Sequence, residues 1–293
     1  MLNERSIHWD ACYNVRDLGG LATKSGVTTR MGALIRADNL SRLTDEGRAT
    51  LMKSGIRTVI DVRDPKELTR EVNPFQPGAV AADALLYQNV PLISEAEWEA
   101  IKDPAVMKQG YVVTLDLSKK NIAAVLRAIA SAPDAGVVFH CHAGKERTGV
   151  VAMLLLELAG VPAEMNADDY CVSDRYLEPL YRQWADKEPD AEERARIIRG
   201  NSSHPDEVLQ PLAHIAAVGG IDSYLASVGL GESEIANLRA RLLGLRGIND
   251  DRVKAVSRPR VPAAPTRGSA PARTVQTRRR ATRRGRSARD SAG

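Results

Sequence analysis

The segment HCHAGKERTG, residues 140–149, has the residue types and spacing for chemistry on phosphate. Cys141 and Arg147 flank a short loop that follows a strand-like run, GVVFH, and precedes a helix-like run, VVAMLLLELAG. A loop in this position can turn its backbone N–H groups inward, and such a nest at a helix N-terminus binds a tetrahedral dianion. The same nest stabilises a thiolate at its floor, so we predict that Cys141 is a nucleophile.

The neighbours of Cys141 fit supporting roles. Arg147 falls in the first helical turn, where its planar fork can hold two phosphate oxygens. Gly144 allows close backbone approach, Gly149 allows tight packing of the helix, Thr148 is placed to donate to the thiolate, and His140 to hold the loop through a backbone hydrogen bond. The predicted phosphate-binding residues are His142, Ala143, Gly144, Lys145, Glu146 and Arg147.

Cleavage of a phosphate ester is also helped by an acid that protonates the leaving group. Asp61 ends the strand-like run RTVIDV, and parallel sheets place their ligands at the carboxyl ends of strands. Asp61 therefore lies at the edge of the predicted sheet where a ligand is expected, and a structural role at the strand end is the alternative. Asp64 is a weaker candidate.

The elements around these residues alternate between strands and helices. Strands are expected in ALIRA, RTVIDV, DALLYQNVPL and GVVFH. Helices are expected from a Thr44 cap to about Lys53, from a Ser118 cap through KKNIAAVLRAIA, and after the loop as far as Gly160. This order predicts an α/β fold with a mainly parallel central sheet flanked by helices.

The chain after Pro162 has almost wholly helical signals. The expected segments lie near residues 163–172, 174–187, 190–199, 205–218, 220–228 and 232–244. We expect them to pack on the sheet, giving one catalytic domain over residues 1–249.

Residues 250–293 are predicted to form a disordered tail rich in Arg, Ala, Pro and Ser. Residues 251–293 contain twelve Arg and one Lys against two Asp, a net charge of +11, so the +4 of the whole chain leaves −7 on residues 1–250. The basic pI of about 9.0 therefore belongs to the tail. Binding of the tail to an anionic membrane surface or to nucleic acid is the alternative to a solvated arm.

Three widely spaced cysteines do not form a secreted disulfide framework. The start of the chain lacks the apolar stretch of a signal peptide, and the longest apolar run, residues 150–156, is too short to span a bilayer. We therefore expect a soluble, cytoplasmic protein, with secretion without a recognisable signal left open. Zinc at His140, Cys141 and His142 is disfavoured because no second ligand pair appears at metal spacing, so neither a metal nor a cofactor is expected.

The loop sequence resembles the HCxxGxxR signature of the protein tyrosine phosphatase superfamily, and its form HCxAGKxRTG narrows the match. With NVRDLGG (residues 14–20), LIRADNLSRLTDEGRATL and GIRTVIDVRDPKE, it is similar to the bacterial and fungal branch that includes dual- and triple-specificity, phosphoinositide-active members. The resemblance runs over residues 14–243. It implies a tyrosine phosphatase-like fold and a covalent cysteinyl-phosphate intermediate.

Carried over residue by residue, the resemblance implies that Cys141 is the nucleophile and Arg147 the phosphate clamp. Lys145 matches a lysine associated with broad, lipid-inclusive specificity. Glu146 stands where the family usually has Asp, and Asp61 matches the family's other candidate acid, so the acid stays open between these two.

Three functions remain in view. The first is hydrolysis of phosphotyrosine-type monoesters, the second is hydrolysis of phosphoinositides by the same residues, and the third is phosphate binding without cleavage. Around the site, Arg16 and Asp17 of NVRDLGG are expected to form an ion pair that supports the loop.

Overall fold

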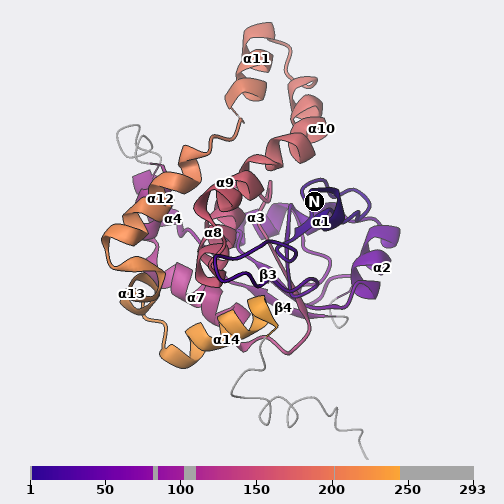
Figure 1. Ribbon diagram of the computed structural model, residues 1–293. Helices are drawn as coiled ribbons and strands as arrows, with labels where there is room; N and C mark the ends of the chain where they lie inside the picture. The colour runs from indigo at the N-terminus through magenta and orange to yellow at the C-terminus, as the bar shows by residue number, and fades with distance from the viewer. Residues whose placement is uncertain (1, 82–84, 102–109, 201, 245–293) are drawn as a thin grey trace, which may run out of the picture.

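The structure, a computed structural model, describes residues 2–81, 85–101, 110–200 and 202–244. Its sheet has five strands in the order β1-β2-β5-β3-β4. The strands are β1 (Arg16–Asp17), β2 (Leu34–Ala37), β3 (Ile56–Asp61), β4 (Leu86–Asn89) and β5 (Gly136–His140). All neighbours pair in parallel except β1, which runs antiparallel to β2 at the edge. The predicted α/β fold with a mainly parallel central sheet is confirmed (Figure 1).

Successive side chains of a strand point to opposite sides of the sheet, and all residues of β2 and β5 are buried, so these central strands are covered on both faces. In β5, Val137 and Phe139 pack into the larger core cluster, whereas Val138 packs into the smaller one. Leu34 and Ile35 of β2 divide between the two clusters in the same way. Strands buried on both faces are expected to be continuously apolar, which is what GVVFH and ALIRA show.

Helices cover both faces and fill the second half of the chain. They are α1 (Leu2–Arg5), α2 (Asp45–Lys53), α3 (Pro65–Arg70), α4 (Glu95–Ile101), α6 (Tyr111–Leu117), α7 (Lys119–Ser131), α8 (Glu146–Ala159), α9 (Ala163–Cys171), α10 (Ser173–Ala185), α11 (Ala191–Gly200), α12 (Asp206–Ala217), α13 (Gly220–Ser227) and α14 (Glu232–Leu243), with a 3₁₀ turn η1 (Leu40–Arg42). The helical second half predicted from the sequence is confirmed.

The central helix is α8, which contacts β2 and β5 on one side and α9, α12, α13 and α14 on the other. A helix enclosed in this way is apolar all round, which explains the run VVAMLLLELA. Gly160 ends it in the left-handed conformation, with φ +81°, as its sequence position predicted.

Two capping predictions have different outcomes. Thr44 accepts a hydrogen bond from the backbone N–H of Gly47 and begins α2, as expected. Ser118 also precedes its helix, α7, but its side chain makes no capping hydrogen bond; the same residue ends α6, and its hydroxyl is buried.

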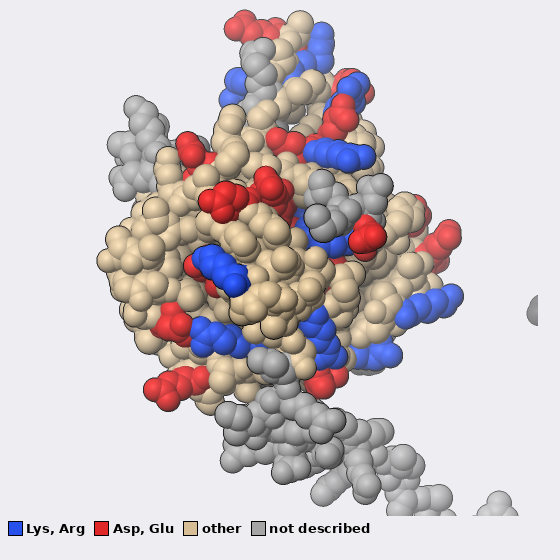
Figure 2. Space-filling view, viewed as in Figure 1, with Lys and Arg blue, Asp and Glu red and all other residues tan. Residues whose placement is uncertain are grey.

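Helices α10 and α11 rise together from the body of the molecule (Figure 1). The space-filling view shows acidic and basic side chains interspersed over the visible face (Figure 2). The predicted basic tail, residues 250–293, lies outside the described residues, as does the end of the predicted domain at residue 249. Among the described helices, none combines the length and the apolar character needed to cross a bilayer.

Candidate active site

The loop 141–147 begins where β5 ends and enters the first turn of α8. In the sheet register, His140 at the end of β5 lies level with Ala37 of β2 and Asp61 of β3. The loop therefore sits over the carboxyl edge of three parallel strands, where open α/β sheets place their ligands.

Gly144 makes the loop's tight return possible. Its φ is +66°, and a Cβ atom there would lie 2.4 Å from the carbonyl oxygen of Ala37. Glycine is thus required by the conformation and by the end of β2 beneath it, rather than by approach of a ligand.

Every backbone carbonyl from residue 141 to residue 145 accepts a hydrogen bond from a group outside this stretch. The donors are His140 Nδ1 to Cys141 (3.0 Å), Asn39 N to His142 (3.0 Å), Asn14 Nδ2 to Ala143 and Gly144 (3.0 and 3.1 Å), and Arg36 Nη2 to Gly144 and Lys145 (2.9 and 3.3 Å). In a trans peptide the N–H points opposite to the C=O. Carbonyls held outward therefore turn the N–H groups of residues 142–146 toward the inside of the loop, which makes the anion nest expected from the sequence.

Cys141 lies at the base of this nest with an exposed fraction of 1%. The hydroxyl of Thr148 is buried nearby in the first turn of α8, and no described residue hydrogen-bonds to it. The predicted hydrogen bond from Thr148 to the sulfur is therefore not formed in this structure. Gly149, one residue on, leaves room for Tyr170 of α9, whose ring would lie 2.9 Å from an added Cβ, so the predicted close packing is confirmed.

Arg147 forms a two-pronged ion pair with Glu67 of α3. Nη2 lies 2.9 Å from Oε1, and Nη1 contacts Oε2. Burial lowers the pKa of Arg147, but the hydrogen bond to Glu67 and the nearby Cys141 outweigh it, so the pKa is raised and the guanidinium stays charged. Burial raises the pKa of Glu67, and Arg147 reverses that shift and keeps the carboxylate ionised.

His140 connects the loop to the strand ends. Its Nδ1–H donates to the carbonyl of Cys141, which is the backbone hydrogen bond predicted from the sequence. Its Nε2 lies 2.9 Å from Asn73 Nδ2 and 3.3 Å from a carboxylate oxygen of Asp61. The ring is fully buried and held from both sides.

Asp61 is part of this buried support and not of the loop's interior. It accepts from Arg63 (2.7 and 2.9 Å), Asn73 (3.1 Å) and Tyr87 (3.1 Å), and it is completely buried. Burial raises the pKa of Asp61, but His140 and Arg63 outweigh burial and hold it far below its ordinary value. These contacts favour the structural role at the strand end that was the alternative for Asp61, since an ionised carboxylate in such a network holds its partners in place.

Glu146 is exposed at the first turn of α8, directly before Arg147. Lys145 points elsewhere: its side chain is 3% exposed, its Nζ lies 3.4 Å from Asp174 of α10, and it approaches the ring of Tyr170. The start of α10 therefore covers Lys145, and its side chain does not project outward to a substrate.

An aromatic wall, formed by His142, Tyr181 and Trp184, borders the loop. The rings of His142 and Trp184 stack at a centroid distance of 5.8 Å, and Trp184 meets Tyr181 at 5.6 Å. Tyr13 and Ala143 join the same apolar cluster. Burial and Arg42 lower the pKa of His142, against the attraction of Glu71, so the ring is neutral at neutral pH.

The predicted ion pair between Arg16 and Asp17 is not formed, because neighbouring residues of β1 point to opposite sides. Arg16 contacts Asn14, Ser173 and Asp169. Asp17 accepts instead from the backbone N–H groups of Gly19 (2.7 Å) and Gly32 (2.6 Å).

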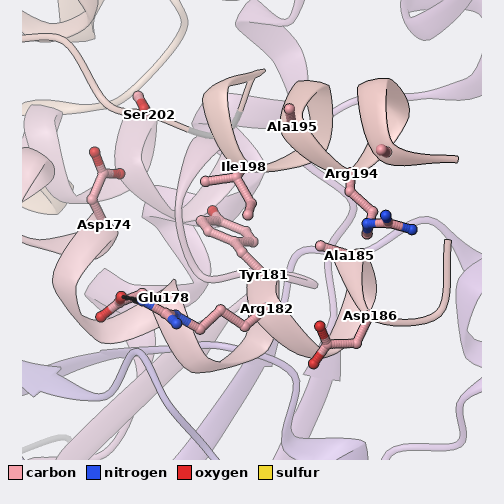
Figure 3. Close-up of a pocket in the computed structure, with 11 residues that line it drawn as sticks. Asp174, Glu178, Tyr181, Arg182, Ala185, Asp186, Arg194, Ala195, Ile198 and Ser202 are labelled. Carbon is pink, nitrogen blue, oxygen red and sulfur yellow. Dashed lines mark hydrogen bonds and ion pairs between the residues drawn. The ribbon is translucent and has the colours of Figure 1, made fainter. Parts of the chain in front are cut away.

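A cavity of about 600 Å³ lies between α10 and α11. Figure 3 shows Tyr181 and Ile198 facing each other across it, with Asp174 toward one end. Neither Cys141 nor Arg147 lines it. The cavity adjoins the catalytic loop through Asp174, which contacts Lys145.

Sequence reasoning did not single out Arg36, Glu67 or Asp169, and it used Asn14 only as part of a motif. Asn14 is the first residue of the NVRDLGG motif, so its membership of that motif was the signal that could have identified it. Glu67 and Asp169 belong to other helices, and only the tertiary fold brings Glu67 to Arg147 and Asp169 to Arg36, which in turn contacts the loop.

An anion nest that begins at a cysteine and ends at an arginine, on the carboxyl edge of an α/β sheet, is the arrangement expected of a phosphatase. The model of the tyrosine phosphatase family matches residues 7–244, and the chain belongs to this family of hydrolases. A tyrosine-protein phosphatase of Nostoc commune is 33% identical over 229 residues, covering 72% of this chain and 74% of the relative. A triple specificity protein phosphatase, PtpB, of Mycobacterium tuberculosis is 27% identical over 271 residues, covering 79% of this chain and 97% of the relative.

Proposed function

We propose that the chain hydrolyses phosphotyrosine and related phosphomonoesters through a covalent cysteinyl-phosphate, without a metal or cofactor. The observation that carries this proposal is the outward fixation of the carbonyls of residues 141–145. It turns the amides of residues 142–146 toward the inside of the loop, which begins at Cys141 and ends at Arg147. Preorganised donors of this kind stabilise charge that develops in a transition state.

The reaction proceeds in two displacements. The Cys141 thiolate forms a bond to phosphorus while the ester oxygen leaves and takes a proton from an acid. Water then attacks the cysteinyl-phosphate, loses a proton to a base, and releases inorganic phosphate and the thiolate.

Glu146 is the residue we propose as acid and base. It is exposed on the loop directly before Arg147, whereas Asp61 is buried and ionised. A carboxyl group at the loop's mouth can exchange protons with both the leaving group and water.

Phosphotyrosine is the substrate class that the rim favours. His142, stacked on Trp184, presents an aromatic and uncharged wall beside the nest, which suits a phenyl ring better than a polyanionic sugar. The relative named a triple specificity phosphatase supports breadth beyond phosphotyrosine, so phosphoinositide hydrolysis is the second candidate.

Hydrolysis of para-nitrophenyl phosphate in the presence of a chelator tests the proposal. We expect turnover that is insensitive to the chelator and absent in Cys141→Ser. Binding of orthovanadate without any turnover would instead identify a non-catalytic phosphate-binding protein.

A further inference from the structure

Asp169 of α9 is a buried carboxylate in contact with three arginines. Arg36 Nη1 lies 2.8 Å from Oδ2, Arg16 Nε lies 3.4 Å from Oδ1, and Arg5 also contacts Oδ1. Arg16 donates in addition to the backbone carbonyl of Asp169 at 2.6 Å. The side chains of Asp169, Arg16 and Arg36 are each 1% exposed, so solvent screens none of these contacts.

Two of the three arginines lead directly to the catalytic loop. Arg36 uses Nη1 for Asp169 and Nη2 for the carbonyls of Gly144 and Lys145. The planar guanidinium of Arg36 thus connects the carboxylate of Asp169 to the backbone of the loop, with one terminal nitrogen on each. The orientation of that plane is fixed by Asp169.

Arg16 reaches the loop through one more residue. Its Nη1 donates to the side-chain oxygen of Asn14, which orients the amide so that its Nδ2 donates to Ala143 and Gly144. Asp169 is therefore connected to the carbonyls of residues 143–145 through two separate chains of hydrogen bonds, one through Arg36 and one through Arg16 and Asn14.

The cluster is unbalanced in charge. Three guanidinium groups face one carboxylate, and the nearby Asp17 is engaged by two backbone amides on the other side of β1. Burial and the charge of Arg36 lower the pKa of Arg16, whereas the three arginines hold the pKa of Asp169 below its usual range despite burial. Removal of Asp169 would leave Arg16 and Arg36 repelling each other directly behind the loop.

We propose that Asp169 is a positioning residue of the phosphatase reaction, acting through Arg36, Arg16 and Asn14 to aim the loop amides at the phosphate. This inference rests on the proposed function, since it assigns the loop as the phosphate site. The competing interpretation is that Asp169 only joins α9 to the sheet. That role would change stability but not the affinity of the folded protein for an oxyanion.

Orthovanadate binding by the full chain, measured by calorimetry at a temperature well below unfolding, separates the two interpretations without requiring turnover. We expect Asp169→Asn to weaken vanadate binding at least about tenfold, as loss of a charge-assisted hydrogen bond would. The matched control is Asp17→Asn, which removes an equally buried carboxylate on β1 that makes no contact with the loop carbonyls. It should lower the melting temperature and leave vanadate affinity within about twofold of wild type.

Arg36→Lys is the second variant and keeps the charge beside Asp169. An ammonium donates from one nitrogen and cannot span the distance that Arg36 covers with two, so vanadate binding should again weaken about tenfold. Wild-type affinity in a folded Asp169→Asn or Arg36→Lys protein would overturn the positioning role. If the wild-type chain binds vanadate but does not hydrolyse aryl phosphates, the proposed function fails while the inference on loop geometry is still decided.

Discussion

Arg147 and Glu67 form a fork-to-fork ion pair in which the residue proposed to grip phosphate is already held by a carboxylate. Glu67 also accepts from the backbone N–H of Asp64 at 2.9 Å and so completes the capping box of α3. Two of the five guanidinium N–H groups are used by this pair, which leaves the others for a ligand. The start of a short helix therefore sets the orientation of the phosphate clamp.

Glu67→Gln should lower kcat/KM on para-nitrophenyl phosphate about tenfold, because an amide keeps the cap on α3 but holds the guanidinium more weakly. Steady-state kinetics measure the effect. Glu95→Gln is the control. Glu95 pairs with Lys66, the neighbour of Glu67 on α3, and because this pair is exposed its loss should leave kcat/KM unchanged. A gain in kcat/KM for Glu67→Gln would show that the carboxylate competes with phosphate.

Cys141→Ser and Arg147→Lys should each lower kcat by at least about 100-fold, since one removes the nucleophile and the other the planar fork. Circular dichroism should show an unchanged fold. Cys141→Ser should still bind orthovanadate, because the nest is held by groups other than the sulfur. Activity within about tenfold of wild type in either variant contradicts the mechanism.

Glu146→Gln should reduce turnover of phenyl phosphate about 100-fold but that of an ester with an acidic leaving group far less. The reason is that only the poorer leaving group needs the proton. Kinetics on a series of aryl phosphates measure this dependence. The same loss on every ester would show that Glu146 is not the acid.

Asp61→Asn should lower the free energy of unfolding by about 3 kcal/mol, as expected when one partner of a buried ion pair is removed. It should show no leaving-group dependence, because the ionised carboxylate supports His140 and Arg63. Denaturant unfolding and the aryl phosphate series decide between this role and that of an acid. A steep leaving-group dependence would restore Asp61 as the acid.

Lys145→Ala should reduce kcat/KM on phosphotyrosine peptides and on phosphoinositides in equal proportion, because its ammonium is buried against Asp174. His142→Ala is the comparison, since its ring is 35% exposed at the rim and should change the ratio of the two activities. The ratio of the two kcat/KM values is the readout. A selective loss on phosphoinositides in Lys145→Ala would mean that the lysine reaches the substrate.

Removal of residues 250–293 should leave turnover of small aryl phosphates unchanged and reduce salt-sensitive binding to anionic vesicles. Each basic residue near such a surface contributes about 1 kcal/mol. Sedimentation with vesicles containing phosphatidylserine measures this binding. A full-length chain with Gln at Arg278, Arg279, Arg280, Arg283 and Arg284 separates charge from length, and equal binding by all forms excludes an electrostatic tether.

The sequence predicted the strands and helices around the loop well, because local signals are strong there. Apolar runs marked β2, β3 and β5, and Thr44 and Gly160 marked helix ends. The spacing of Cys141 and Arg147 predicted the nest that the structure shows.

Tertiary contacts explain what the sequence could not predict. The start of α10 covers Lys145, and Asp61 becomes a buried structural support only where Arg63, Asn73 and Tyr87 converge on it in the fold. These partners lie on separate elements, so no periodicity or spacing connects them. The same holds for Asp169, which is an ordinary helical residue until the fold places three arginines beside it.

The five outward-facing carbonyls of the loop also imply that the proposed enzyme binds its own product. An amide nest built during folding needs no rearrangement to receive a phosphate ester, but it is equally ready for any tetrahedral oxyanion of the same size. Inorganic phosphate, the product of each turnover, meets the same amides and the same arginine as the substrate. The proposed aryl ester differs from free phosphate by its ring, so under this proposal the aromatic wall of His142, Tyr181 and Trp184 is what distinguishes substrate from product.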